Sequence, residues 1–292
     1  MSFTSIMFNI NASRSDRKRD SLIPLPRGIV ECRNIRYGSH GNENLLDVYY
    51  PEGTATALPT IVSIHGGGYV YGSKEIYRRY SMDMARRGFA FVNFNYRLAP
   101  RWKFPTPLWD TNYVMEWICR NAERYHLDPS RIILVGDSAG AQLASQYAAI
   151  ATNADYAALF QMEVPNIQIQ ALGLNCGMYD MAHQGAAPRK GIHLDYLGRD
   201  IPADDPRFNV LEAIGSNYPA AYITTACHDF LRNAAEPMYD HLISKGIRTA
   251  WKCYGKEEDK SIGHVFHVNI VLPEAIRCND DTAAFFLSVL SE

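Results

Sequence analysis

The sequence lacks a marked excess of charge of either sign, because 29 Lys and Arg residues stand against 31 Asp and Glu residues. Binding to nucleic acid or to an anionic membrane surface depends on a basic excess, so neither partner is expected. No apolar run reaches the length that crosses a bilayer, and residues 1–20 lack the basic-then-apolar order of a signal peptide. These absences predict a soluble, cytoplasmic protein.

The sequence also lacks any CxxC pair, although it has six cysteines. A disulfide framework suits small secreted chains, so we expect a reducing compartment. Cys119, Cys176 and Cys227 lie in apolar stretches and are interpreted as small core residues. No internal repeat and no low-complexity tract is found.

Strand-like and helix-like segments alternate along the 292 residues, of which 47% are hydrophobic. This alternation predicts crossover connections and a mostly parallel sheet flanked by helices, with a hairpin at its start. Strands are predicted at 29–37, 44–50, 59–64, 89–94, 131–135, 171–176, 221–226 and 249–254. Helices are predicted at 74–87, 109–125, 142–150, 237–245 and 280–290. The charged run 14–20 is expected to be a solvated helix or arm, and the irregular insertion 179–218 to be a lid or cap.

A glycine-flanked serine, Gly136-Asp137-Ser138-Ala139-Gly140, stands between the apolar run 132–135 and a helical stretch. This order of strand, sharp turn and helix is typical of the nucleophile elbow of an α/β-hydrolase. Glycines are needed there because the chain packs too closely for side chains on either side of the serine. The sequence therefore predicts that Ser138 is an exposed nucleophile.

The partners of such a serine occur in the chain order serine, acid, histidine. Asp229 follows the strand predicted at 221–226, and His264 follows the loop after the strand at 249–254. The carboxyl ends of parallel strands meet at one edge of a sheet, which also carries the elbow. We therefore expect Ser138, His264 and Asp229 to form a nucleophile–base–acid triad.

A glycine-rich segment, His65-Gly66-Gly67-Gly68, follows the strand predicted at 59–64. Successive glycines let backbone N–H groups approach a substrate without interference from a Cβ atom. The sequence predicts an oxyanion hole made by the amides of Gly66, Gly67 and Ala139.

Other residues compete for two of these roles. His267 is an alternative base, which we interpret as structural or surface-exposed, and Glu236 is an alternative acid. His228 adjoins the acid, and neighbouring side chains diverge. His65 is expected to hold the glycine loop by hydrogen bonds, and Asp137 to bond backbone away from the substrate.

Five motifs together resemble the hormone-sensitive-lipase-like family of serine esterases. The glycine segment with Tyr69 matches the family's HGGG-aromatic motif, and residues 96–100 read YRLAP, followed by Phe104-Pro105. Residues 136–140 match its GDSAG elbow, 229–232 (DFLR) its acid motif DPLR, and 264–266 (HVF) its base motif HGF. The similarity extends from about residue 45 to the C-terminus.

The resemblance implies an α/β-hydrolase fold, carboxylic-ester hydrolysis through an acyl-serine, and neither a metal nor an organic cofactor. It implies a single catalytic domain over residues 1–292, with a cap from residues 1–40 and 179–218, and it is compatible with a homodimer. The chain departs from the family pattern at Arg101, Phe230 and Ala141. None of these three is expected to touch the reacting atoms.

We therefore expect a carboxylesterase that acts on small, short-chain acyl esters, including acetylated sugars or aryl esters. The alternatives are a peptidase or amidase and a small-molecule receptor without turnover, of which the receptor is disfavoured because His264 is present. Several aromatic residues either line the substrate pocket or belong to the core, and for Trp109 the core is the preferred interpretation. They are Tyr69, Tyr71, Trp102, Trp109, Tyr179 and Tyr196.

Overall fold

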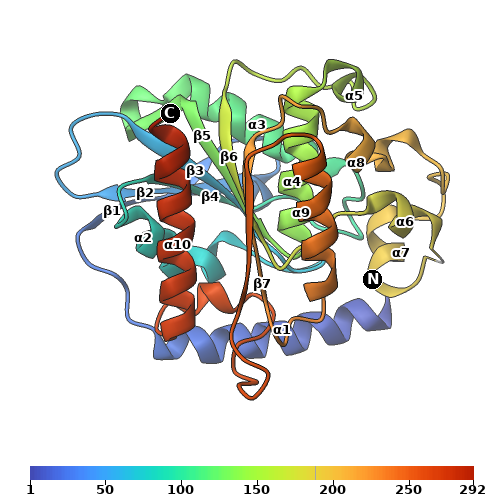
Figure 1. Ribbon diagram of the computed structural model, residues 1–292, viewed down its shortest axis with the longest axis horizontal. Helices are drawn as coiled ribbons and strands as arrows, with labels where there is room; N and C mark the ends of the chain where they lie inside the picture. Colours follow the sequence, from blue (N-terminus) through green and yellow to red (C-terminus); the bar gives the residue numbers. More distant parts are fainter. Residues whose placement is uncertain (188) are drawn as a thin grey trace.

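One eight-stranded sheet forms the centre of the computed structural model, which describes residues 1–187 and 189–292 (Figure 1). The strand order is β1-β2-β4-β3-β5-β6-β7-β8. β1 pairs antiparallel with β2, and β2 with β4, while the remaining neighbours are parallel. The predicted mostly parallel sheet with an initial hairpin is confirmed. The strands are β1 (Ile29–Arg36), β2 (Leu45–Pro51), β3 (Leu58–Ile64), β4 (Ala90–Phe94), β5 (Leu127–Asp137), β6 (Ile169–Asn175), β7 (Ala220–Ala226) and β8 (Thr249–Tyr254).

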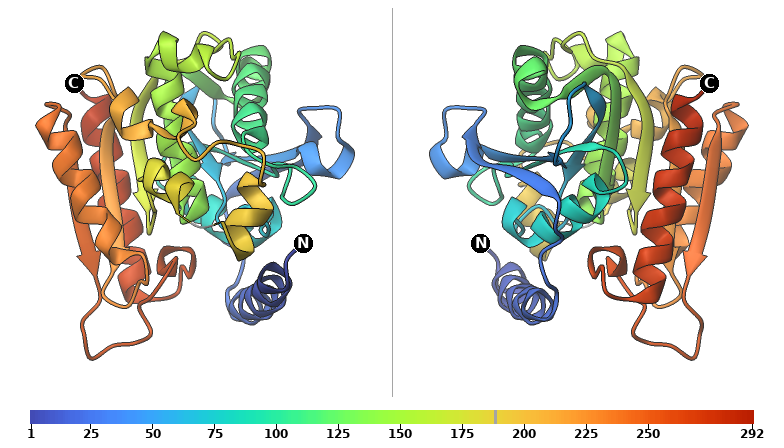
Figure 2. Two further views of the ribbon diagram at one scale, coloured as in Figure 1. Left: turned by 90° about the vertical axis from the view of Figure 1, so that its right-hand side faces the viewer. Right: turned by 90° about the vertical axis from the view of Figure 1, so that its left-hand side faces the viewer.

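Helices cover both faces of the sheet (Figure 2). One face carries α2 (Arg78–Ala85) and α10 (Pro273–Leu290), and the other carries α3 (Thr106–Asn121), α4 (Ala139–Thr152) and α9 (Ala235–Ser244). Successive strand residues enter opposite cores: Ile61 packs on the α2 and α10 side and Val62 on the α3 and α4 side. This alternation follows from the two-residue period of a strand. An apolar core therefore packs on each face of the sheet, and the two cores fix the positions of the strand ends at its carboxyl edge.

Some helix boundaries differ from the sequence predictions. α10 begins at Pro273 rather than at residue 280, because a proline is well tolerated in the first turn of a helix. α3 likewise begins at Thr106, with Pro107 in its first turn. The predicted helix 74–87 is a 3-10 turn followed by α2. Further short helical segments are η1 (Gly41–Asn44), η2 (Lys74–Tyr77), η3 (Glu123–Tyr125), α5 (Ala154–Ala158), η5 (Arg232–Ala234) and η6 (Phe266–Val268).

The insertion between β6 and β7 consists of short helices, and Pro188 within it lies outside the described residues. Its segments are α6 (Met181–Ala186), α7 (Gly191–Leu197), η4 (Pro206–Phe208) and α8 (Val210–Ala213). α1 (Phe3–Leu22) lies across the edge at which the parallel strands end (Figures 1 and 2). The two segments meet where the Ser2 N–H donates to Asp195 Oδ2 over 2.7 Å.

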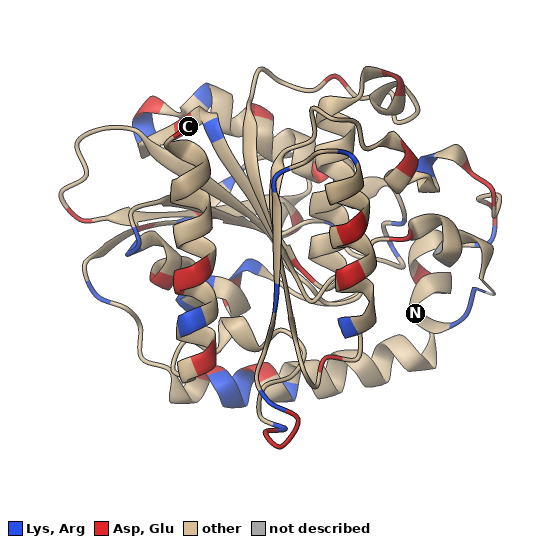
Figure 3. Ribbon diagram, viewed as in Figure 1, with Lys and Arg blue, Asp and Glu red and all other residues tan. Residues whose placement is uncertain are grey.

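The charged run 14–20 is part of α1, and Figure 3 shows both signs in the second half of this helix. Arg14, Arg17 and Lys18 are exposed as predicted, whereas Asp16, Arg19 and Asp20 are half-buried. Arg19 pairs with Asp16 over 2.9 Å and with Asp20 over 2.8 Å. Within the described part of the chain, no helix is both long enough and apolar enough to span a membrane.

The cysteines differ in part from their predicted core positions. Cys176 is buried as expected, but Cys119 and Cys227 are only half-buried. All six cysteines are free thiols in the structure. The apolar residues next to Cys227 in the sequence wrongly predicted its burial, because Cys227 lies just beyond the end of β7 rather than within the strand.

Candidate active site

Ser138 occupies a strained turn between β5, which ends at Asp137, and α4, which begins at Ala139. Its backbone angles are φ 54° and ψ −119°, a region that residues other than glycine rarely adopt. The Ser138 N–H donates to Asn175 O over 2.9 Å, which ties the turn to the end of β6. A Cβ atom on Gly140 would lie 2.0 Å from Ile64 O, so close packing requires this glycine. The local geometry is thus that of the predicted elbow.

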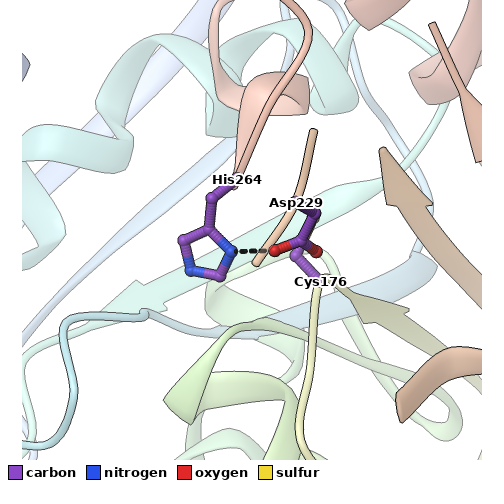
Figure 4. A group of neighbouring side chains, drawn as sticks. All are labelled: Cys176, Asp229 and His264. Atoms are coloured by element: carbon purple, nitrogen blue, oxygen red, sulfur yellow. Dashed lines mark hydrogen bonds and ion pairs between the residues drawn. The ribbon is translucent and has the colours of Figure 1, made fainter. Parts of the chain in front are cut away.

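His264 and Asp229 form a direct hydrogen bond, with 2.7 Å between Nδ1 and Oδ1 (Figure 4). Asp229 is buried and also accepts from Thr225 Oγ1 and from the Leu231 N–H, each over 2.9 Å. Burial alone would raise the pKa of the Asp229 carboxyl, but the bonds from His264 and the Leu231 N–H hold it below its usual range. An ionised Asp229 fixes the proton on Nδ1, so Nε2 of His264 is left as a proton acceptor.

Ser138 and His264 line the same cavity, whose volume is about 730 Å³. In Figure 4 the second ring nitrogen of His264 points away from Asp229. Among the described residues no hydrogen bond joins the Ser138 hydroxyl to His264. Such bonds are often long in enzymes without substrate and tighten when the substrate binds.

The glycine loop lies beside the elbow and also lines the cavity. Gly67 has φ 117°, and a Cβ atom there would lie 2.1 Å from Tyr71 O, so only glycine fits. Within the described part of the chain, the amides of Gly67 and Ala139 donate to no protein group. The Gly66 N–H, in contrast, donates to the Tyr77 hydroxyl over 3.1 Å. This corrects the prediction at Gly66, because its single N–H is already engaged by a side chain from η2.

The competing histidines have structural surroundings. His267 is buried against Tyr80, away from the cavity, and burial lowers its pKa to about 3. His65 is also buried; it stacks on Tyr96, and its Nδ1 lies 2.7 Å from Gly66 O. Burial lowers the pKa of His65 to about 4, so its ring is neutral and holds the loop as expected. His228 contacts Glu257 O instead of the cavity.

Neither of the competing carboxylates is hydrogen-bonded to His264 within the described part of the chain, although Asp137 borders the cavity. Glu236 is exposed on α9, whereas Asp137 is buried beneath the elbow. We expected Asp137 to bond backbone, but its Oδ2 accepts from the Tyr77 hydroxyl over 2.7 Å. Burial raises the pKa of Asp137 to about 7. Tyr77 therefore bridges the elbow and the glycine loop, a link that the sequence did not indicate.

The cavity has a wall from α1 as well as from the sheet edge. Phe8, Asp16 and Arg19 of α1 line it together with Ile192 of α7. Asp16 Oδ2 accepts from the Tyr71 hydroxyl over 2.8 Å, which fastens the helix to the glycine-loop segment.

Two of the six candidate aromatic residues, Tyr69 and Tyr71, line this cavity. Tyr179 and Tyr196 are buried in the core. The core interpretation of Trp109 was wrong, because its side chain is 38% exposed and its indole N–H donates to Phe160 O at the surface of α3.

Phe230 is a second residue whose position the sequence did not predict. Its ring centroid lies 4.2 Å from that of His264, and its side chain lines the cavity although it is 76% exposed. We expected that this departure from the acid motif does not touch the reacting atoms; its ring nevertheless lies against the imidazole of His264. Its only sequence signal was an apolar residue directly after the acid.

Cys176 completes the surroundings of the acid. It is buried just after β6, its Sγ lies within 4.8 Å of a carboxylate oxygen of Asp229, and the same Sγ accepts from the Val265 N–H over 3.4 Å. Cys176, Asp229 and His264 place one ligand-type atom each within 4.8 Å of one another, so they also have the composition of a metal site. His264 Nδ1 is engaged by Asp229, and Cys176 Sγ already accepts from the Val265 N–H, which suits a hydrogen-bonded acid–base group better.

Comparisons with known proteins place the chain in a family. A family model described as BD-FAE matches residues 46–231. The chain is 33% identical over 243 residues to carboxylesterase NlhH of Mycobacterium tuberculosis, covering 76% of this chain and 72% of that protein. It is 30% identical over 206 residues to an ethyl acetate hydrolase of Pseudomonas putida, covering 66% of this chain and 63% of that one.

Solved structures share the fold. Esterase B from Lactobacillus rhamnosis superposes with a TM-score of 0.86 at 23% identity, covering 96% of this chain and 92% of that chain. An esterase from Pyrobaculum calidifontis gives a TM-score of 0.75 at 23% identity, covering 99% of this chain and 94% of that one. The predicted α/β-hydrolase fold is confirmed, and the chain belongs to the BD-FAE family, a hormone-sensitive-lipase-like family of α/β-hydrolases.

Proposed function

We propose that this protein is a serine carboxylesterase in which Ser138, His264 and Asp229 act as nucleophile, base and acid. The observation that carries the proposal is the 2.7 Å bond between His264 Nδ1 and Asp229 Oδ1 at the wall of the cavity that Ser138 also lines. The esterase names of the relatives support the same reaction class.

In the first half of the reaction, Ser138 Oγ attacks the ester carbonyl and His264 Nε2 takes its proton. The resulting oxyanion accepts hydrogen bonds from the amides of Gly67 and Ala139, which have no acceptor among the residues that the structure describes. Gly66 then acts as an anchor of the loop through Tyr77, since its N–H is engaged. Asp229 stabilises the imidazolium and keeps its orientation.

In the second half, the imidazolium gives its proton to the leaving alcohol and an acyl-serine remains. His264 then takes a proton from water, which attacks the acyl carbon. The bond between that carbon and Ser138 Oγ breaks, His264 returns the proton to Oγ, and the carboxylic acid leaves. These steps use only protein groups and water.

We propose that the leaving alcohol is aryl or otherwise apolar. The alcohol oxygen must come within about 3 Å of His264 Nε2 to receive its proton. Atoms beyond that oxygen then lie against Phe230, whose ring is 4.2 Å from the imidazole. The cavity volume of about 730 Å³ is suited to a small ester with a short acyl chain.

We propose a single catalytic domain with a cap formed by α1 and the insertion 179–218. The contact between Ser2 and Asp195 and the shared lining by Phe8 and Ile192 support this arrangement. The remainder of the segment 1–40 contributes β1 to the sheet. The homodimer and the cytoplasmic location stay predictions, and light scattering would test the first.

The test is burst kinetics with p-nitrophenyl acetate, with p-nitroacetanilide as the amide counterpart. The wild-type protein should release one equivalent of nitrophenol rapidly and then turn over, whereas Ser138→Ala should lose both phases. Ser130→Ala changes an exposed serine of β5 and should behave as wild type. Ester binding without any burst would contradict the proposal and favour a receptor. Faster cleavage of the amide would favour an amidase.

A further inference from the structure

Two thiols meet at the edge of the sheet, outside the proposed active site. Cys227 Sγ and Cys253 Sγ are hydrogen-bonded at 3.6 Å. Cys227 follows β7, and Cys253 lies on β8, the edge strand. Cys253 is exposed and Cys227 is half-buried, so small reagents reach the pair. We propose that Cys227 and Cys253 are a site of reversible disulfide formation.

The pair stands at the common base of the two loops that carry the proposed acid and base. Cys227 is two residues before Asp229, and Cys253 precedes the loop that leads to His264. Backbone contacts already join the two loops: the Cys227 N–H donates to Tyr254 O over 2.9 Å, and His228 pairs with Gly263. A covalent bond here therefore acts directly on the segments that place Asp229 against His264.

The chemistry requires a small-molecule disulfide as oxidant, for example glutathione disulfide. One protein thiolate attacks a sulfur of glutathione disulfide and releases one glutathione, which leaves a mixed disulfide. The second protein thiol loses its proton and attacks the protein sulfur, which releases the second glutathione. Two electrons pass from the protein to glutathione disulfide, and the two thiol protons end on the two glutathione molecules.

Closure of the bond changes the local structure. A disulfide has an S–S distance of about 2.05 Å, so the sulfurs must approach each other by roughly 1.5 Å. The Cys227 thiol also donates to Gly255 O over 3.3 Å, and oxidation removes this donor. We expect the proposed Asp229–His264 pair to be displaced and turnover to fall by roughly tenfold, because small misplacements of reacting groups are costly.

The experiment treats the folded full-length protein with glutathione disulfide, alkylates the remaining thiols and measures mass and cross-linked peptides. The expected product has lost about 2 Da and two alkylation sites, with one peptide pair joining Cys227 to Cys253. Cys253→Ser should not form this product, whereas Cys119→Ser, which changes a half-buried thiol on α3, should form it normally. The mass readout is independent of whether the protein hydrolyses esters.

Turnover is measured in parallel, and dithiothreitol should restore both the mass and the rate. A stable glutathione adduct without the internal bond, or no reaction at all, would overturn the proposed site. A complete internal bond with unchanged kcat would overturn the coupling to Asp229 and His264. In Cys253→Ser the rate should not respond to glutathione disulfide.

Discussion

The Tyr77 hydroxyl donates to Asp137 Oδ2 over 2.7 Å and accepts from the Gly66 N–H over 3.1 Å, with both side chains buried. Through this one oxygen, the residue before the nucleophile is connected to the first glycine of the loop that faces it. The Tyr77 side chain therefore sets the distance between the elbow and the glycine loop. That distance determines where the Gly67 amide stands relative to Ser138.

Tyr77→Phe is expected to lower kcat by roughly tenfold to a hundredfold with little change in KM, because misplaced oxyanion donors weaken only the transition state. The variant also leaves the buried Gly66 N–H unpaired, which costs about 1–3 kcal/mol of stability. Steady-state kinetics and urea unfolding measure the two effects. Tyr80→Phe is the matched control, since the Tyr80 ring is buried on α2 against Phe91. Equal kinetics for the two variants would refute the bridging role.

Phe230→Ala is expected to reduce kcat/KM for phenyl acetate by roughly threefold to tenfold, because an aromatic contact is worth about 0.5–1.5 kcal/mol. The value for ethyl acetate should change much less, since ethanol offers little surface to the ring. Phe3→Ala removes a side chain of the same 76% exposure outside the cavity lining and should leave the ratio of the two substrates unchanged. A parallel loss on both esters would argue against recognition of the alcohol.

Cys176→Ala removes the thiol that lies beside Asp229 and accepts from the Val265 N–H. We expect kcat to fall by roughly threefold to tenfold while KM stays the same, because the orientation of the acid–base pair is loosened. Cys176→Ser should recover most of the rate, since a hydroxyl oxygen also accepts from the Val265 N–H. A serine variant as slow as the alanine variant would show that volume, and not hydrogen bonding, matters at this position.

The buried Asp137 makes the stability depend on pH. Its pKa is about 7 in the folded protein and near 3.8 when unfolded, so the folded state holds the extra proton between these values. Its contribution to the free energy of unfolding is full below about pH 4 and declines until about pH 7. The stability of the wild type relative to Asp137→Asn should therefore fall from pH 5 to pH 8. Urea unfolding of both proteins across this pH range measures the difference in their free energies of unfolding. The contributions of the buried histidines are the same in both proteins and cancel in this difference. A constant difference would mean that Asp137 titrates outside this window.

Gly140→Ala places a Cβ atom 2.0 Å from Ile64 O and 2.7 Å from His65 O, both backbone atoms that cannot turn away. We expect the free energy of unfolding to fall by roughly 3 kcal/mol or more, or the variant not to fold at all. Gly53→Ala is the control, because Gly53 has φ 79° with nothing within 4 Å and should lose only about 1 kcal/mol. Similar urea midpoints for the two variants would contradict the packing argument.

The sequence predicted those parts of the structure that have a local cause. The strands follow from short apolar runs, and the elbow at Ser138 follows from glycines that exclude Cβ atoms. The closeness of Asp229 and His264 was predicted because both follow parallel strands whose ends share one edge of the sheet.

Contacts that depend on side-chain direction or on docking could not be predicted. The Tyr77 hydroxyl meets Gly66 only after η2 folds back under the loop, and the largely exposed ring of Phe230 lies against His264. The charges of α1 alternate without an apolar stripe, so its sequence did not indicate that Asp16 and Arg19 face the cavity.

The position of α1 has a practical consequence for anyone who handles this protein. The backbone N–H of Ser2 donates to Asp195, and the part of the helix from Phe8 to Arg19 borders the cavity. An affinity tag or a deletion at Met1 is therefore expected to disturb the wall of the cavity that α1 forms. KM values measured on such a protein should then differ from those of the unaltered protein. A tag after Glu292 follows the end of α10, which lies far from α1 in Figure 1, and leaves the entrance intact.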